Sequence, residues 1–215
     1  MIPLKFRKSS DKIVSYSFND IIDGTGYKTF YAVDLMSGAV IDYQLTSNAY
    51  DGDAGYTEMD ASGTGMLKEF NFDVKFDQPK RINGDIIVNA THGVYTNGND
   101  VSIQPRVRIY HVGTTGTETE IGLQQSGAVL FKTTAGDRIG HRGCYKFPNV
   151  QRNFKSNEKL RLNIEIHGVP SGGVQTNAYL FHDGGNKDFG YDLDYGTSVT
   201  APTSLKIDVP FDLQL

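Results

Sequence analysis

Apolar and polar residues alternate along much of this chain, most clearly in the segment LKEFNFDVKF at 67–76. Phe70, Phe72, Val74 and Phe76 occupy every second position there. Successive side chains of a strand point to opposite faces, so these four lie on one face of a predicted strand. The segment therefore predicts a strand with one buried face.

Two further apolar runs follow, at 85–91 and 101–109. An Asn-Gly pair precedes each run, at 83–84 and 97–98, and this dipeptide readily adopts the positive φ angles of a tight reversal. Together with the preceding strand, the two runs predict an antiparallel meander of three strands over 67–112.

Alternating or short apolar segments recur on both sides of the meander. They lie at 27–35, 40–45, 128–131, 160–166, 178–181 and 205–215. Residues 46–65 and 182–203 have no apolar period and predict two long loops, which in compact domains are usually functional or mobile. Residues 135–158 are also expected to be irregular, because Gly136, Gly140, Gly143 and Pro148 interrupt them.

The pattern contains about ten to twelve regularly punctuated strands and no amphipathic helix of about ten residues. Such a chain needs two packed sheets or a closed barrel to bury its apolar faces. We therefore expect an all-β fold, a single antiparallel β-sandwich of the jelly-roll-like kind, formed as one domain by residues 1–215. The 24 glycines fit a chain with many turns.

Charge and apolar content exclude some classes of partner. The formal net charge is −4, whereas a nucleic-acid surface needs a concentrated excess of Lys and Arg. No segment approaches the roughly 18 apolar residues of a membrane helix, and the first residues lack a signal-peptide core. We expect a soluble chain made in the cytoplasm that binds neither nucleic acid nor membrane.

His141 and Cys144, in GHRGCYKF, are candidates for metal or thiol chemistry. A structural zinc site needs four ligands, and Cys144 is the chain's only cysteine. A cysteine nucleophile needs a histidine beside it, and nothing in the sequence marks one. We expect no catalytic residue and no cofactor.

A second candidate is a cation site in the loop HDGGNKDFGYDLDYG. Calcium takes six to eight oxygen ligands, which clustered carboxylates and loop carbonyls supply. The ligand spacing of an EF-hand is absent, and Asp is also an ordinary turn residue, so the interpretation as turns is favoured. The candidate ligands are Asp183, Asn186, Asp188, Asp192 and Asp194.

Tyrosines in the two long loops indicate a contact surface. Tyrosine offers a large contact area with few rotatable bonds, and loops rich in Tyr, Ser, Gly and Asn suit recognition. The alternative is that these rings cap the ends of the sandwich. The interface candidates are Tyr50, Tyr56, Tyr191 and Tyr195.

Both ends of the chain resemble small structural proteins of tailed phages and related environmental viruses. The matching segments are MIPLKFRKSS with the following DGTGYKTFY, then NEKLRLNIE at 157–165, a His-Asp turn with Asn186 and Asp188, and LKIDVPFDLQL. The middle, 46–158, has no such match. The resemblance implies a virion component with a β-sandwich fold that decorates or cements a capsid.

From this resemblance we expect a non-enzymatic structural protein located in the virion. Its partners would be copies of itself, with a trimer favoured by the local symmetry of a capsid lattice, and the major capsid protein or other virion proteins. The loop tyrosines and strand edges would form the contacts.

Two alternatives remain open. The first is a carbohydrate- or receptor-binding β-sandwich of a phage tail or fibre, against which the absence of tryptophan weighs. The second is a hydrolase with two carboxylates about 5–10 Å apart in a cleft. Glu69 and Glu165 are strand glutamates on faces predicted to be polar, although solvated strand faces explain them more simply.

Overall fold

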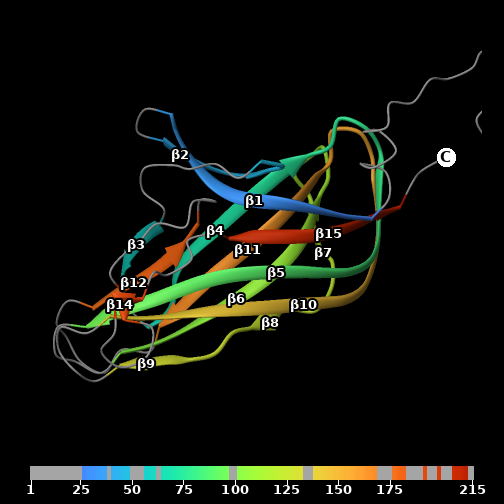
Figure 1. Cartoon of the computed structure of the whole chain (residues 1–215). Coiled ribbons are helices and arrows are strands. Elements are labelled where there is room, and N and C mark those ends of the chain that lie inside the picture. Colours follow the sequence, from blue (N-terminus) through green and yellow to red (C-terminus); the bar gives the residue numbers. More distant parts are fainter. Residues whose placement is uncertain are drawn as a thin grey trace, which may run out of the picture.

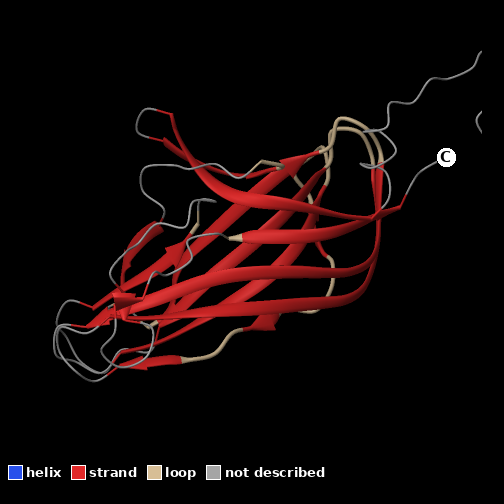
Figure 2. Ribbon diagram, in the orientation of Figure 1, coloured by secondary structure: helices blue, strands red, loops and turns tan. Residues whose placement is uncertain are grey.

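A computed structural model gives the fold of the 215-residue chain. It describes residues 26–37, 40–48, 56–61, 64–96, 101–132, 138–168, 176–182, 191–192, 198–199 and 205–212. Every regular element in these ranges is a strand, which confirms the all-β prediction (Figure 2). The described ranges contain fifteen strands, ten of which are five residues or longer.

The strands differ widely in length, from two to seventeen residues. The strands are β1 (Gly26–Ser37), β2 (Val40–Thr46), β3 (Tyr56–Asp60), β4 (Gly65–Lys75), β5 (Lys80–Thr96), β6 (Val101–Val112), β7 (Glu118–Glu120), β8 (Gln125–Ser126), β9 (Leu130–Lys132), β10 (Arg138–Phe154), β11 (Lys159–Gly168), β12 (Thr176–Phe181), β13 (Tyr191–Asp192), β14 (Ser198–Val199) and β15 (Lys206–Asp212).

These strands form one hydrogen-bonded sheet that folds over on itself into two layers (Figure 1). The first layer runs β10-β5-β15-β1, and the second runs β2-β4-β11-β6. The β1–β2 hairpin joins the layers. All strand pairings in the described ranges are antiparallel except β10–β13 and β2–β4, each of which is a single parallel contact. The result is a sandwich-like fold.

The core lies between the layers and contains the apolar positions that alternation predicts. Phe70 and Phe72 of β4 are fully buried, as are the alternating apolar residues of β11 and β15. Across the layers, the ring of Phe76 packs edge-on against Phe154 and Phe211, with centroids 5.1 and 5.7 Å apart. Burying each such ring stabilises the fold by about 1.5–3 kcal/mol.

The predicted meander over 67–112 is wrong in its pairing. The three strands exist, but β4 pairs with β11, β5 with β10 and β15, and β6 with β11. Asn83-Gly84 is not a reversal, because it lies inside β5. Gly84 has a φ of 140°, and a side chain there would lie 3.2 Å from the Pro210 ring, so the glycine serves a close approach of β15.

The predicted irregularity at 135–158 is also wrong. Residues 138–154 form β10, which pairs with β5 along its whole length. Gly143 leaves room for the ring of Tyr145, which folds back over it: a Cβ at that position would lie 2.3 Å from the Tyr145 Oη. Pro148 falls where the register with β5 shifts, between Phe147 and Val150, and a bulge tolerates its missing N–H.

The predicted loops are only partly loops. Within 46–65 the structure places β3, which pairs with β12, and within 182–203 it places the two-residue strands β13 and β14. None of the described segments is a helix long and apolar enough to cross a membrane.

Candidate functional site

Polar side chains cover the outer surface of β4, β11 and β6, opposite the core. In β11, Asn163, Glu165 and His167 alternate with Leu162, Ile164 and Ile166, which point into the core. β11 is flanked by β4 on one side and β6 on the other, so its polar residues meet polar residues from both neighbours. We call this surface the polar sheet face; its members include Glu69, Asn71, Asp73, Arg108, Tyr110, Arg161, Asn163, Glu165 and His167.

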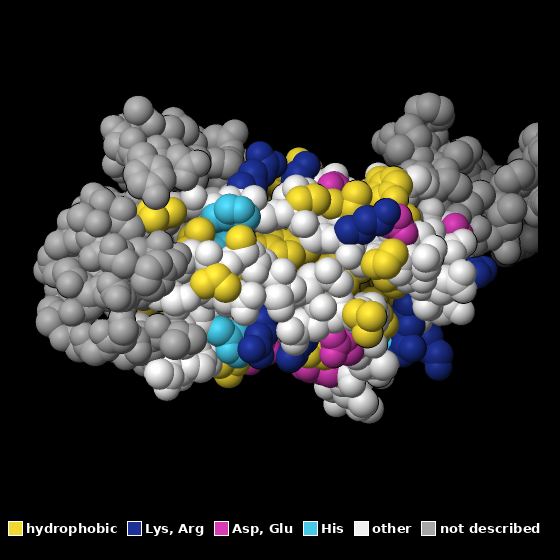
Figure 3. Space-filling model, turned by 90° about the horizontal axis from the view of Figure 1, so that it is seen from below, with side chains coloured by type: hydrophobic (Ala, Val, Ile, Leu, Met, Phe, Trp, Pro, Cys, Tyr) yellow, Lys and Arg dark blue, Asp and Glu magenta, His cyan; other side chains and the backbone are white. Residues whose placement is uncertain are grey.

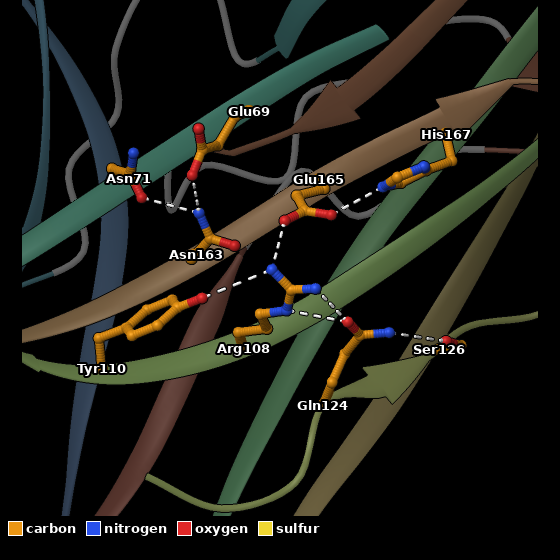
Figure 4. Close-up of polar contacts among 9 residues, drawn as sticks. All are labelled: Glu69, Asn71, Arg108, Tyr110, Gln124, Ser126, Asn163, Glu165 and His167. Atoms are coloured by element: carbon orange, nitrogen blue, oxygen red, sulfur yellow. Dashed lines mark hydrogen bonds and ion pairs between the residues drawn. The ribbon is translucent and has the colours of Figure 1, made fainter. Parts of the chain in front are cut away.

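Glu165 lies at the centre of this face and is 7% exposed. Figure 4 shows its carboxylate between Arg108 and His167. Arg108 Nη1 donates to Oε1 at 2.8 Å, and His167 Nε2 contacts Oε2 at 2.7 Å. An ionised carboxylate only accepts, so His167 carries its proton on Nε2. Both oxygens of Glu165 are therefore engaged.

Arg108 links Glu165 to two other side chains. Its Nε and Nη2 both donate to the Gln124 Oε1, at 2.8 and 2.5 Å, and Nη1 reaches the Tyr110 Oη at 3.5 Å. The bond to Tyr110, with a smaller contribution from the charge of Glu165, raises the pKa of Arg108. The guanidinium is thus fixed in one orientation.

Asn163 connects the central strand to β4. It is 1% exposed, and its Nδ2 donates to the Glu69 Oε1 at 2.5 Å and to the Asn71 Oδ1 at 2.8 Å. Within the described part of the chain, the Asn163 Oδ1 is buried and accepts no hydrogen bond. The same pairing places Glu69 directly opposite Glu165. Opposed Cβ atoms in antiparallel strands lie about 4.5–5.5 Å apart.

At the other end of the face, Arg161 forms a bidentate pair with Asp73. Nε donates to Oδ1 at 2.7 Å and Nη2 to Oδ2 at 2.8 Å, and Nη1 also reaches the Glu118 Oε1 at 2.5 Å. The Asp73 bonds raise the pKa of Arg161. Two parallel N–H···O bonds give geometric specificity as well as attraction, so this end is also rigid.

A second Glu–His pair lies near the end of the sandwich, where His111 Nε2 contacts the Glu158 Oε2 at 2.7 Å. Arg152 donates to the His111 Nδ1 from Nε at 2.9 Å. A guanidinium cannot accept, so His111 accepts at Nδ1 and holds its proton on Nε2. The Lys155 backbone N–H and His111 lower the pKa of Glu158.

The structure describes only part of the residues that the sequence marks as candidates. Tyr56 begins β3, while Tyr191 and Asp192 form β13. The structure describes the backbone of these three residues but not their side chains. The remaining candidates lie outside the described residues; they are Tyr50, Tyr195, Asp183, Asn186, Asp188 and Asp194. In the described ranges, no three His, Cys, Asp or Glu side chains gather as a metal site.

Cys144 and His141 do not meet. Cys144 is exposed on the outer surface of β10, whereas His141, three residues earlier, faces inward, where its ring packs edge-on against His92 with centroids 5.5 Å apart. Residues an odd number apart on a strand point to opposite faces. The pair therefore forms no thiol–imidazole site.

Sequence reasoning named Glu69 and Glu165 but missed Arg108, Asn163 and His167. The alternation in RVRIYHV and RLNIEIHG places these polar residues on one face of each strand. It does not show that β6 and β11 are neighbours, and so it does not show that the residues meet.

Charges on the surface are mixed. In the view of Figure 3, coloured Lys and Arg side chains lie beside Asp and Glu side chains, with hydrophobic groups between them. The coloured part of this face therefore carries no extended patch of one sign.

No family model matches the chain, and no curated protein matches it. Among solved structures, two of a CocE/NonD family hydrolase from Staphylococcus aureus are similar, at 10% identity and TM-scores of 0.50 and 0.52. They match 88% and 87% of this chain but 37% of the hydrolase, so the chain spans a little over a third of that protein's length. A chain in a structure of infectious bursal disease virus (Gx strain) is also similar, at 15% identity and a TM-score of 0.30; the match covers 88% of this chain and 37% of the viral chain.

These comparisons correct one expectation. The sequence predicts a chain with no enzymatic activity, but two solved structures that share its fold are of a CocE/NonD family hydrolase. At this identity the likeness shows the fold alone. The viral match is too distant to carry an argument.

Proposed function

We propose that this chain is a structural protein of a virus particle that acts by binding other macromolecules. Its partners would be copies of itself, as a homo-oligomer with a trimer favoured, and the major capsid protein. The polar sheet face would be its contact surface. The resemblance of both chain ends to phage structural proteins supports the role, and a sandwich-like fold fits it.

The observation that carries the proposal is the pre-ordering of the polar sheet face. Arg108 is held by Glu165, Gln124 and Tyr110, and Arg161 by Asp73 and Glu118. Side chains that are already fixed lose little conformational entropy on binding, which is a main cost of association. Glu69, at the exposed edge of the face, would then meet the partner directly.

The test is co-sedimentation with native particles that lack the protein, together with an electron-microscopy map of the complete particle. Glu69→Lys should weaken particle binding about tenfold or more, equivalent to about 1.4 kcal/mol. Arg142→Glu, on the exposed outer surface of β10 in the other layer, is the matched control and should bind as wild type. Wild-type protein that fails to sediment with particles, or E69K that binds normally, would overturn the proposal.

A second candidate, hydrolysis of a polysaccharide, is favoured by the register that sets Glu69 opposite Glu165. Retaining glycosidases use two carboxyl groups about 5–5.5 Å apart. Exposed Glu69 would protonate the leaving oxygen. Glu165 is 7% exposed and bonded at both oxygens, so it would have to exchange its contact with His167 for the sugar before it attacks the anomeric carbon and water releases the product.

A reducing-sugar assay over a panel of polysaccharides tests this candidate. Glu69→Gln and Glu165→Gln should each lower the rate about 100-fold or more. Glu118→Gln, on an exposed carboxylate at the other end of the face, should leave the rate within about twofold, since within the described residues the Glu118 side chain forms an ion pair with Arg161 alone. A rate that is absent in wild type, or unchanged in both glutamine variants, rules the candidate out.

A further inference from the structure

Four polar side chains meet on the inner side of the sandwich, near the paired strands β3 and β12 (Figure 1). Asp34 of β1 lies directly opposite Tyr43 of β2 in the hairpin register. Thr57 of β3 lies opposite Leu180, and His182 follows two residues later on the same face. The Tyr43 ring packs edge-on against the buried face of β4, so this cluster lies on the opposite side of β4 from the polar sheet face.

The contacts of the cluster run from a hydroxyl through an imidazole to a carboxylate. Thr57 Oγ1 lies 2.8 Å from the His182 Nε2, and the other ring nitrogen, Nδ1, lies 3.7 Å from the Asp34 Oδ1. The carboxylate favours the tautomer with its proton on Nδ1, so Nε2 accepts from the Thr57 hydroxyl. The 3.7 Å contact is longer than a hydrogen bond, and catalytic contacts often tighten when substrate binds. This is the order of groups in a nucleophile–His–Asp triad.

Tyr43 adds a second hydroxyl beside the Thr57 oxygen. Burial raises the pKa of Tyr43, and a hydrogen bond with Thr57 partly offsets the rise. A phenol with a raised pKa keeps its proton near pH 7 and can donate it to a hydrogen bond. A carbonyl group attacked by Thr57 would place its oxygen close to this donor, as in an oxyanion hole.

The imidazole is enclosed, whereas the two hydroxyl-bearing side chains are half-buried. His182 is fully buried, and its ring centroid lies 6.2 Å from those of both Tyr43 and Phe72. Thr57 and Tyr43 are partly exposed, so a substrate would approach from their side. An enclosed site strengthens the hydrogen bonds within it. The aromatic rings around the cluster suit a short apolar acyl group.

We propose that this cluster is an esterase site for short acyl groups, with Thr57 as its nucleophile. The His182 Nε2 takes the Thr57 proton as Oγ1 bonds to the ester carbonyl carbon, and Tyr43 donates to the oxyanion that forms. The C–O bond to the alcohol then breaks, and the alcohol leaves with the proton from His182. Water attacks acyl-Thr57 in the same way, which releases the carboxylic acid and returns the proton to Thr57. Asp34 is a positioning residue that orients the His182 ring.

The experiment is hydrolysis of p-nitrophenyl acetate by the full chain. Thr57→Val keeps the shape of the side chain without its hydroxyl, and His182→Gln removes the base; each should lower the rate about 100-fold or more. Thr57→Ser retains a hydroxyl and should remain active. Thr29→Val is the matched control, because it removes a hydroxyl bonded to Asp208 on the outer side of β1, and its rate should equal that of wild type.

Two further readouts separate chemistry from structure. Asp34→Asn should lower kcat about tenfold or more with KM within about twofold, because the ring loses its orientation while the acyl site is unchanged. Mass spectrometry of an acid-quenched reaction should find the acetyl group on the peptide that contains Thr57. This localisation distinguishes the site from unspecific acetylation of surface side chains.

Three results would overturn the proposal. They are a wild-type rate no higher than that of protein-free buffer, an unchanged rate in Thr57→Val, and an acetyl group found only on other residues. Far-UV circular dichroism checks that the variants fold. Should His182→Gln fail to fold, the comparison of Thr57→Val with Thr57→Ser decides, since these two differ at a single side chain and only one carries a hydroxyl.

Discussion

The ionisable ring of His92, on β5, is buried between the two layers. It is fully buried, and apart from a contact with the Ala128 backbone neither ring nitrogen has a hydrogen-bonding partner in the described structure. Burial, with a contribution from the neighbouring His141, lowers the pKa of His92 to about 3. Its ring is thus neutral near pH 7.

The buried His92 makes stability depend on pH. In the unfolded chain, histidine titrates near pH 6.5. Between about pH 6.5 and 3 the unfolded state binds a proton that the folded state does not, so the stability present above pH 6.5 is lost as pH falls. The free energy of unfolding should decrease by about 1.4 kcal/mol per pH unit from this group alone.

Urea denaturation at several pH values between 4 and 7 measures this effect. His92→Leu removes the titrating ring, and the carboxylates titrate alike in both proteins. The difference between the two pH profiles therefore isolates His92. The variant should also be more stable near pH 7, because a buried polar ring whose hydrogen bonds are largely unmade is replaced by an apolar side chain. Parallel profiles would show that His92 is not buried as a neutral ring.

At the scale of the strands, alternation predicted which residues are buried better than which strands pair. The buried faces of β4, β11 and β15 follow the predicted pattern. The partner of β4 is β11, which joins Asp73 to Lys159, 86 positions apart. Nothing in either segment encodes that pairing, because many alternating strands present equivalent edges, and the packing of the whole sandwich selects among them.

The rule that glycine and proline interrupt a strand fails in β10 for a physical reason. The rule predicts an interruption at Gly143, yet this residue faces inward and makes room for the Tyr145 ring. The rule also predicts an interruption at Pro148, yet this residue falls at a shift of register between β10 and β5. A glycine or proline disfavours a strand only where a side chain or an N–H is needed, and that need depends on residues from distant strands.

The same limit applies to the candidate site. The polar character of Asn163, Glu165 and His167 is visible in the sequence. Their contacts with Arg108 and Glu69 depend on the β11–β6 and β11–β4 registers. A shift of one residue would turn each polar set toward the core, so burial of the apolar residues also fixes the register that assembles the site.

At the scale of the molecule, the C-terminal strand completes the first layer rather than bordering it. β15 lies between β5 and β1 and pairs with both. Leu205, Ile207, Val209 and Phe211 are all buried. At about 1.5–3 kcal/mol for each buried side chain, this segment contributes about 6–12 kcal/mol, which is comparable to the whole stability of a typical domain.

A chain that ends at Ser204 should therefore lose its cooperative thermal transition, and a synthetic peptide of residues 205–215 should restore it. The peptide would insert between β1 and β5 and regain both ladders, as in other cases of strand addition. Circular dichroism melts with increasing peptide measure the recovery. A peptide carrying Ile207→Asp and Val209→Asp is the control and should restore nothing, because it places two charges in the core. If the truncated chain melts cooperatively within a few degrees of the full chain, the fold does not depend on β15 for its stability.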